Sequence, residues 1–236
     1  MRKRMLSIWL CLMMVMSILP TVSFAAESDT APEGGAKIYV DAVKGDDAQT
    51  DVGTTAEKAY KTLATAVTAA ASGDTIVLGE GKYTLYGVNS EGHTKGKDLT
   101  FVGQGADKTS WGIGATMPDP DKFGTEYNGD YSFDGAGTIT FQNMTLQSAS
   151  ANYLGFIRAD KTVVEDCIIN GKTFYWGYTS ATFKNTTFNC PSEDYAIWTY
   201  SSPTMTFDTC TFNSSGKVIN VYTDAGAGKK ISQSTI

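Results

Sequence analysis

The sequence predicts an all-β chain folded as a solenoid, in which short parallel strands return once per coil. The first observation is a segment that occurs four times with small changes: ITFQNMTL (139–146), VVEDCII (163–169), ATFKNTTF (181–188) and MTFDTCTF (205–212). The second is its regular spacing, because the apolar residues that open the copies lie 23, 19 and 24 residues apart: Phe141, Val164, Phe183 and Phe207. A repeat of about 20 to 25 residues built only of short β segments is typical of a solenoid.

The third observation is a turn-forming or small polar residue at the centre of each copy, two positions after the opening apolar residue: Asn143, Asp166, Asn185 and Thr209. Asn and Asp tolerate a left-handed backbone, and their side chains can form hydrogen bonds from coil to coil. We therefore expect Asn143, Asp166 and Asn185 to stack at one bend of the solenoid.

A further strand lies between successive copies of the repeat: YLGFIRA (153–159), TFYWGYT (173–179), YAIWTYS (195–201) and KVINVYT (217–223). Together with the two short apolar segments of each copy, this predicts about three strands per coil. The near-continuous apolar content of these segments favours parallel strands over hairpins.

The chain before the repeat predicts a strand, a short helix and a second strand. KIYVD (37–41) is a strand, and TIVL (75–78) is a buried strand. Between them, the apolar residues Leu63, Ala66, Val67 and Ala70 recur at helical spacing, with Thr62 as N-cap and Gly73 just past the end. A helix this short is marginal alone, so it must bury its apolar side on the β domain.

The segments KIYVDAVKGDD (37–47) and GTTAEKAYKTLATAVTAAASGDTIVLGEGKYTL (53–85) resemble the N-terminal segment of secreted β-helix proteins of the pectin-lyase-like superfamily. With the repeat, this resemblance covers roughly residues 37–236. It implies a right-handed parallel β-helix whose open N-terminal end is capped by the short helix. The superfamily includes lyases and hydrolases that cut acidic polysaccharides, but a fold alone does not assign an activity.

The first residues predict a secretory signal peptide over residues 1–25. A basic MRKRM start precedes an apolar run from Leu6 to Leu19, and small residues up to Ala25 form the cleavage site. The chain is therefore expected to be secreted or displayed on the cell surface, with no membrane span after cleavage. An uncleaved membrane anchor is the alternative.

The rest of the chain divides into a linker (26–36) and a β-helix domain (37–236). A stretch rich in Gly, Pro and aromatic residues (about 106–137) is expected to be a loop that leaves the solenoid. ISQSTI (231–236) repeats the pattern once more, because Ile231 and Ile236 each lie 24 residues after the matching phenylalanine. This predicts that the solenoid continues and that the chain is a truncated part of a longer protein.

Charge and cysteine content narrow the function classes. The formal charge is −6, and signal cleavage would remove three further positive charges, so the chain lacks the basic surface that nucleic-acid binding requires. Cys167, Cys190 and Cys210 remain after cleavage, and Cys167 and Cys210 are expected two coils apart, beyond disulfide reach. A secreted chain without a disulfide framework favours a bacterial source.

No cofactor is expected from the sequence, although calcium is possible at Asp46, Asp47 and Asp51 because calcium prefers several oxygen ligands. Aspartate beside glycine is equally typical of a turn, and the spacing matches no defined calcium loop. We therefore assign no metal site.

The strand between the repeats carries the candidate binding residues. Aligning its copies places Tyr175, Ile197 and Ile219 in one inward column, so that these aromatic residues would point outward: Trp176, Trp198, Tyr178, Tyr200 and Tyr222. Stacked exposed aromatic rings form a flat platform on which sugar rings can lie. Asn220 shares the column of the tryptophans and is costly to bury, which favours this orientation. In the alternative, the phase is reversed and the aromatic residues fill the core.

The sequence assigns no catalytic residues. The hydrolases of the superfamily need a Gly-His-Gly and an Arg-x-Lys segment, and neither occurs here. Its lyases use a basic residue to remove a proton, and Arg158 is the single arginine after the signal. A lone loop histidine, His93, is more typical of a solvated residue than of a general base, and the carboxylate pairs Asp119/Asp121 and Asp130/Asp134 lie in the predicted loop.

The sequence therefore predicts an extracellular β-helix module that contacts a polysaccharide or other glycan without catalysis. The alternative is a polysaccharide lyase or glycoside hydrolase whose catalytic residues lie on coils that this chain lacks.

Overall fold

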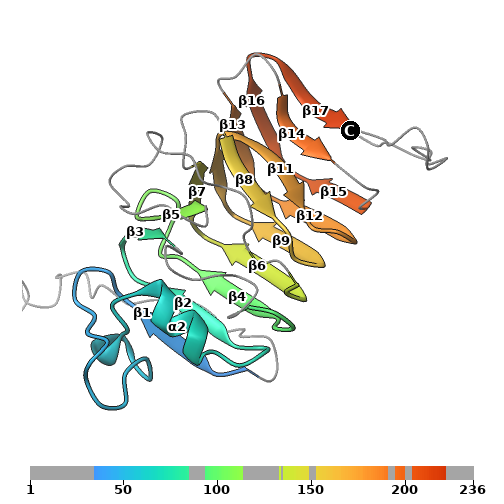
Figure 1. Cartoon of the computed structure of the whole chain (residues 1–236). Helices are drawn as coiled ribbons and strands as arrows, with labels where there is room; N and C mark the ends of the chain where they lie inside the picture. Colours follow the sequence, from blue (N-terminus) through green and yellow to red (C-terminus); the bar gives the residue numbers. More distant parts are fainter. Residues whose placement is uncertain are drawn as a thin grey trace, which may run out of the picture. The chain divides into compact units, whose positions relative to one another are not determined.

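The computed structural model describes residues 35–84, 94–113, 133, 135–148, 153–190, 195–199 and 204–221. The described residues form one compact unit, shown in Figure 1. The predicted signal peptide (1–25) and all but the end of the predicted linker lie outside the described residues. No helix in the described part of the chain has the length and hydrophobicity needed to cross a membrane.

The described strands form three stacked sheets, and every described strand pair is parallel. Sheet A contains, in order, β1 (Lys37–Val40), β2 (Thr75–Leu78), β4 (Leu99–Val102), β6 (Thr138–Gln142), β9 (Lys161–Glu165), β12 (Ser180–Lys184) and β15 (Thr204–Asp208). Sheet B contains β16 (Thr211–Ser214), β13 (Thr187–Cys190), β10 (Ile168–Asn170), β7 (Thr145–Ser148), β5 (Thr109–Ile113) and β3 (Gly81–Thr84). Sheet C contains β17 (Lys217–Val221), β14 (Tyr195–Thr199), β11 (Lys172–Trp176) and β8 (Tyr153–Ile157).

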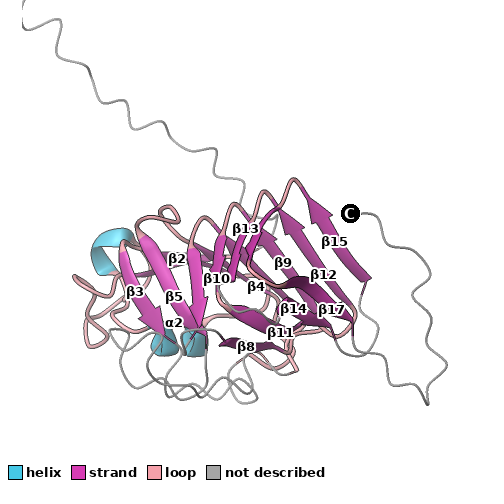
Figure 2. Ribbon diagram, turned by 90° about the horizontal axis from the view of Figure 1, so that it is seen from above, coloured by secondary structure: helices cyan, strands magenta, loops and turns pink. Residues whose placement is uncertain are grey.

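This arrangement is consistent with a parallel β-solenoid, as the sequence predicts. From β2 onward, successive strands along the chain belong to different sheets, and each pairs with strands of its own sheet from neighbouring repeats. Figure 2, seen from above, shows the strands of each sheet running side by side.

The repeat forms the core as expected, because its apolar residues alternate with outward-facing ones along sheet A. Phe141 is paired with Val164, Val164 with Phe183, and Phe183 with Phe207. The rings of Phe183 and Phe207 stack with their centres 5.2 Å apart. Each fully buried side chain of this kind stabilises the fold by about 1.5–3 kcal/mol.

The predicted bend ladder is also confirmed. The described turn residues have left-handed backbone angles, with φ of 57° at Asn143, 52° at Asp166, 47° at Asn185 and 56° at Thr209. The Nδ2 atom of Asn185 donates a hydrogen bond of 2.6 Å to Oδ1 of Asp166. Backbone bonds follow the same path, since the amide of Asp166 donates to the carbonyl of Lys184 at 3.1 Å.

The outer edge of β1 is covered by the chain that follows it, which contains the 3-10 helix η1 (Ala56–Lys58). The amide of Tyr39 donates to the carbonyl of Gly53 at 2.9 Å, and the amide of Asp41 donates to the carbonyl of Tyr60 at 2.8 Å. The amide of Tyr60 donates back to the carbonyl of Tyr39 at 2.8 Å. Because an uncovered strand edge promotes aggregation, these bonds protect one end of sheet A.

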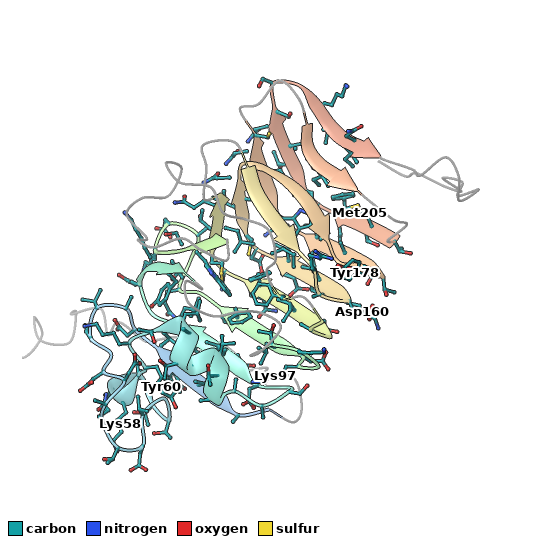
Figure 3. The ribbon with its side chains drawn as sticks, in the orientation of Figure 1. Lys58, Tyr60, Lys97, Asp160, Tyr178 and Met205 are labelled. Carbon is teal, nitrogen blue, oxygen red and sulfur yellow. The ribbon has the colours of Figure 1, made fainter. Side chains whose placement is uncertain are left out.

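The helix α2 (Leu63–Ala69) begins where the sequence predicts. The side chain of Thr62 accepts a hydrogen bond from the amide of Thr65 at 3.3 Å and caps the helix. Leu63, Ala66 and Val67 are buried against the core. Lys97, labelled in Figure 3, donates from Nζ to the carbonyl of Val67 at 3.1 Å, so a positive charge lies near the helix C-terminus, where it is favoured.

The predicted loop over residues 106–137 is wrong in its first part. Strand β5 pairs with β3 and β7 in sheet B, and the ring of Trp111 is fully buried against Phe101 and Phe141. Thus the chain follows the sheets as far as Ile113. Residues 114–132 and Asp134, which include both predicted carboxylate pairs, lie outside the described residues. The predicted further repeat at 231–236 lies outside them as well.

Candidate functional site

The predicted outward orientation of Trp176 is wrong. Its side chain is 2% exposed and packs edge-to-face on Phe183, with the ring centres 5.2 Å apart. Between Phe174 and Trp176 the pairing of β11 with β8 shifts register, so that Trp176 lies opposite Ile157, which is also buried. Strict alternation, on which the prediction depended, fails at this shift.

The two tryptophans also do not share a column. Trp198 of β14 lies opposite Phe174 of β11. The predicted alignment requires it to lie opposite Trp176, two residues further along β11. Trp198 does lie opposite Asn220, and Ile197 opposite Ile219, as predicted. Ile197 is fully buried and Ile219 packs against the core, so the inward column of the prediction holds for these two residues. The side chain of Trp198, and both Tyr200 and Tyr222, lie outside the described residues.

Tyr178 is the predicted binding residue that the structure places at the surface, with 37% of its area exposed. The Nε atom of Arg158 donates a hydrogen bond of 2.5 Å to its hydroxyl oxygen. The guanidinium carbon of Arg158 lies 5.6 Å from the centre of the ring, within range of a cation–π interaction. The tyrosine ring is therefore exposed and held in place by its neighbour.

Two turns of adjacent repeats bring these side chains together. Arg158 and Asp160 lie between β8 and β9, and Tyr178 and Thr179 lie between β11 and β12. The amide of Tyr178 donates to the carbonyl of Ala159 at 3.0 Å, and the amide of Thr179 to the carbonyl of Asp160 at 2.8 Å. The hydroxyl of Thr179 also donates to Oδ1 of Asp160. Figure 3 shows Asp160 and Tyr178 close together at the ends of these strands.

Gly177 makes this turn possible. Its φ of 126° is disfavoured for other residues, and a Cβ atom there would lie 2.4 Å from the backbone oxygen of Ser180. The sharp bend separates Tyr178 from the buried Trp176 only two residues before it. We call Arg158, Asp160, Tyr178 and Thr179 the Tyr178 surface.

The Tyr178 surface combines one aromatic ring with a guanidinium, a carboxylate and a hydroxyl group. The ring offers an apolar face, and the three polar groups supply hydrogen-bond donors and acceptors beside it. The sequence pattern predicted that Tyr178 points outward, but Asp160 and Thr179 were not predicted to lie beside it. Aligning the turn after β8 with the turn after β11 would have placed them side by side.

Asp46 and Asp47, two of the aspartates considered for calcium, accept hydrogen bonds from backbone amides. Oδ1 of Asp47 accepts hydrogen bonds from the amides of Lys61 at 2.8 Å and Thr62 at 3.2 Å, and Oδ1 of Asp46 accepts one from the amide of Ala48 at 3.0 Å. The bond to Asp46 is that expected of a turn residue, whereas Asp47 connects this segment to the chain just before α2. Across the described residues, no group of three or more His, Cys, Asp or Glu side chains could hold a metal ion.

The three described cysteines are free, as expected for Cys167 and Cys210. Cys167 and Cys190 are buried, whereas Cys210 is partly exposed. Burial raises the pKa of the Cys167 thiol to about 12, so it stays protonated at neutral pH and is a poor nucleophile. His93 lies outside the described residues.

No protein-family model, no curated protein and no solved structure matches the chain. The resemblance to the pectin-lyase-like superfamily therefore depends only on the N-terminal segments and the repeat of this sequence.

Proposed function

We propose that the chain is an extracellular β-helix module of a bacterial secreted or cell-surface protein and that it contacts carbohydrate without catalysis. The proposed fold is a right-handed parallel β-helix with about three strands per coil, capped at its N-terminal end by α2. Three parallel sheets, the covered edge of β1 and the buried side of α2 support this fold.

The exposed ring of Tyr178 is the observation that carries the carbohydrate proposal. Sugar rings pack their C–H faces on aromatic side chains, and their hydroxyl groups bond to planar polar groups nearby. Arg158 fixes the ring before any ligand arrives, which reduces the entropy lost on binding. Asp160 and Thr179 supply polar atoms on the adjoining turns.

The same contacts favour a binding role over a catalytic role for Arg158. A lyase of the superfamily would need a basic side chain to remove a proton from its substrate. Arg158 is the single arginine after the predicted signal peptide. Its Nε atom donates a hydrogen bond to the hydroxyl oxygen of Tyr178, so it has a structural role at this surface.

Substitution of Tyr178 tests the proposal. We expect Tyr178→Ala to weaken retention on immobilised neutral plant glycans by about tenfold, because it removes the apolar face. Tyr178→Phe keeps the ring but loses the bond to Arg158, so we expect a smaller loss.

Val218→Ala is the matched control, since Val218 is an exposed side chain (38%) on β17, away from these turns in the sequence. Glycan retention that is unchanged by Tyr178→Ala, with the fold intact by circular dichroism, would contradict a role for the Tyr178 surface.

A further inference from the structure

An open cavity of ≈ 610 Å³ lies at the other end of sheet A from β15, beside β1 and β2. Its floor includes Tyr39 and Val77, which are paired across β1 and β2 and alternate with buried neighbours, so they face away from the core. Val43 and Ala56, from the segment after β1, form another part of the lining. The volume lies within the range of about 300–1,000 Å³ that is usual for small-ligand sites.

The cavity wall is held by hydrogen bonds within the protein. The hydroxyl oxygen of Tyr83 lies 3.1 Å from the carbonyl oxygen of Gly79 and 3.3 Å from that of Val40, and it accepts a bond of 3.3 Å from the amide of Ala42. Burial raises the pKa of Tyr83 to about 12, so the hydroxyl remains a neutral donor. A wall fixed in this way needs little rearrangement to receive a ligand.

Asp41 is fixed in the same wall. Its Oδ1 atom accepts hydrogen bonds from the amides of Val43 at 2.9 Å and Lys44 at 2.8 Å. Gln104 donates from Nε2 to the carbonyl of Leu78 at 3.0 Å, which orients its amide at the cavity. Glu80 also lines the cavity, and its ion pair with Lys108 (3.1 Å) is exposed and therefore weak.

The lining thus combines apolar and polar groups in a defined way. Tyr39, Val77 and Val43, which is 75% exposed, supply apolar area, and two carboxylates, an amide and the ammonium group of Lys44 supply polar contacts. An aromatic ring beside carboxylates suits a sugar ring, because carboxylate oxygens accept hydrogen bonds from hydroxyl groups. Lys44 and Lys108, which pairs with Glu80, offset the two carboxylates, so the charges at the cavity balance and suit an uncharged ligand.

We propose that this cavity binds one ring of a neutral sugar, with its C–H face on Tyr39 and its hydroxyl groups on Asp41 and Glu80. The class of ligand rests on the proposed carbohydrate function, but the site shares no residue with the Tyr178 surface. It is therefore a second contact point for a glycan.

Titration of the isotopically labelled full chain, followed by amide NMR, tests this site directly. The probes are methyl glucoside, methyl galactoside and methyl mannoside. We expect at least one of these neutral glycosides to shift the amide signals of Val43 and Lys44, which bond to Asp41.

Two variants identify the cavity as the site. Ala56→Phe adds a large side chain at an exposed lining position and should weaken binding of the glycoside about tenfold or more. Glu80→Gln replaces a carboxylate acceptor by a weaker neutral amide and should also weaken binding of the glycoside. The remaining amide signals of each variant, unchanged from the parent chain, report that it is folded.

The outcomes separate this inference from the proposed function. No shift with any neutral glycoside, or full binding by Ala56→Phe, would overturn the cavity site, even if glycan retention still depended on Tyr178. Cavity binding that persists in Tyr178→Ala, alongside polysaccharide retention that is insensitive to Tyr178, would support the cavity site and overturn the role of the Tyr178 surface.

Discussion

At the residue scale, the bend ladder shows how single side chains set the path of the chain. The four left-handed turn residues occur where the sequence repeats an Asn, Asp or Thr, and Asn185 bonds to Asp166 from one repeat to the next. An L-residue in this conformation costs about 1–2 kcal/mol, and Asn and Asp reduce that cost. This feature was predictable because it depends on local backbone chemistry.

Substitutions of Asn185 separate the contribution of the left-handed backbone angle from that of the side-chain hydrogen bond to Asp166. We expect Asn185→Ala to lower the free energy of unfolding by about 1–2 kcal/mol, because alanine tolerates the φ of 47° poorly and cannot bond to Asp166. Asn185→Gly should cost less, since glycine accepts this backbone angle and loses only the side-chain bond. Chemical denaturation of both variants measures the difference. A glycine variant as unstable as the alanine variant would show that the hydrogen bond, and not the backbone angle, dominates.

Trp176 and Tyr178 mark the limit of prediction at this scale. They share the same parity in the sequence, yet one is buried and the other is exposed. The register shift in β11 and the bend at Gly177 lie around them, and neither is visible in an alternating pattern. Sequence parity therefore placed Tyr178 correctly at the surface and placed Trp176 on the wrong side.

At the element scale, most strands were predictable from the repeat and from short apolar runs, but β5 was not. The strands β6, β9, β12 and β15 form the first halves of the four copies of the repeat. Strand β5 was predicted as loop because Gly and aromatic residues surround it, although its pairing with β3 and β7 buries Trp111. Tertiary pairing overrides local composition here.

The orientation of β11 can be tested through stability. We expect Trp176→Ala to lower the free energy of unfolding by about 3–5 kcal/mol, because it leaves a large cavity against Phe183. Tyr178→Ala removes a side chain at the surface and should change stability by only about 0.5 kcal/mol. The denaturation midpoints of Trp176→Ala and Tyr178→Ala measure this difference in stability. If Trp176→Ala were as stable as the parent chain, the buried position of Trp176 would be contradicted.

At the scale of the whole molecule, the sheets position two separate surfaces of related chemistry. The Tyr178 surface lies at turns between sheets C and A, and the cavity beside Tyr39 lies along the first strands of sheet A. The sequence predicted the parallel β architecture because the repeat is long and regular. It could not locate the cavity, whose residues come from several segments between Tyr39 and Gln104.

The proposed function as a whole is that the chain binds carbohydrate and leaves it intact. The acidic chain, with a formal charge of −6, is expected to prefer neutral glycans to pectate.

The most direct test incubates the full chain with neutral plant glycans and with pectate, and measures retention and turnover in the same samples. We predict retention of a neutral glycan, no new reducing ends and no ultraviolet absorption from unsaturated products. New reducing ends would indicate a hydrolase, and unsaturated products would indicate a lyase. Either result, or the absence of retention on every glycan, would contradict the proposal that the chain is a non-catalytic carbohydrate-contacting module.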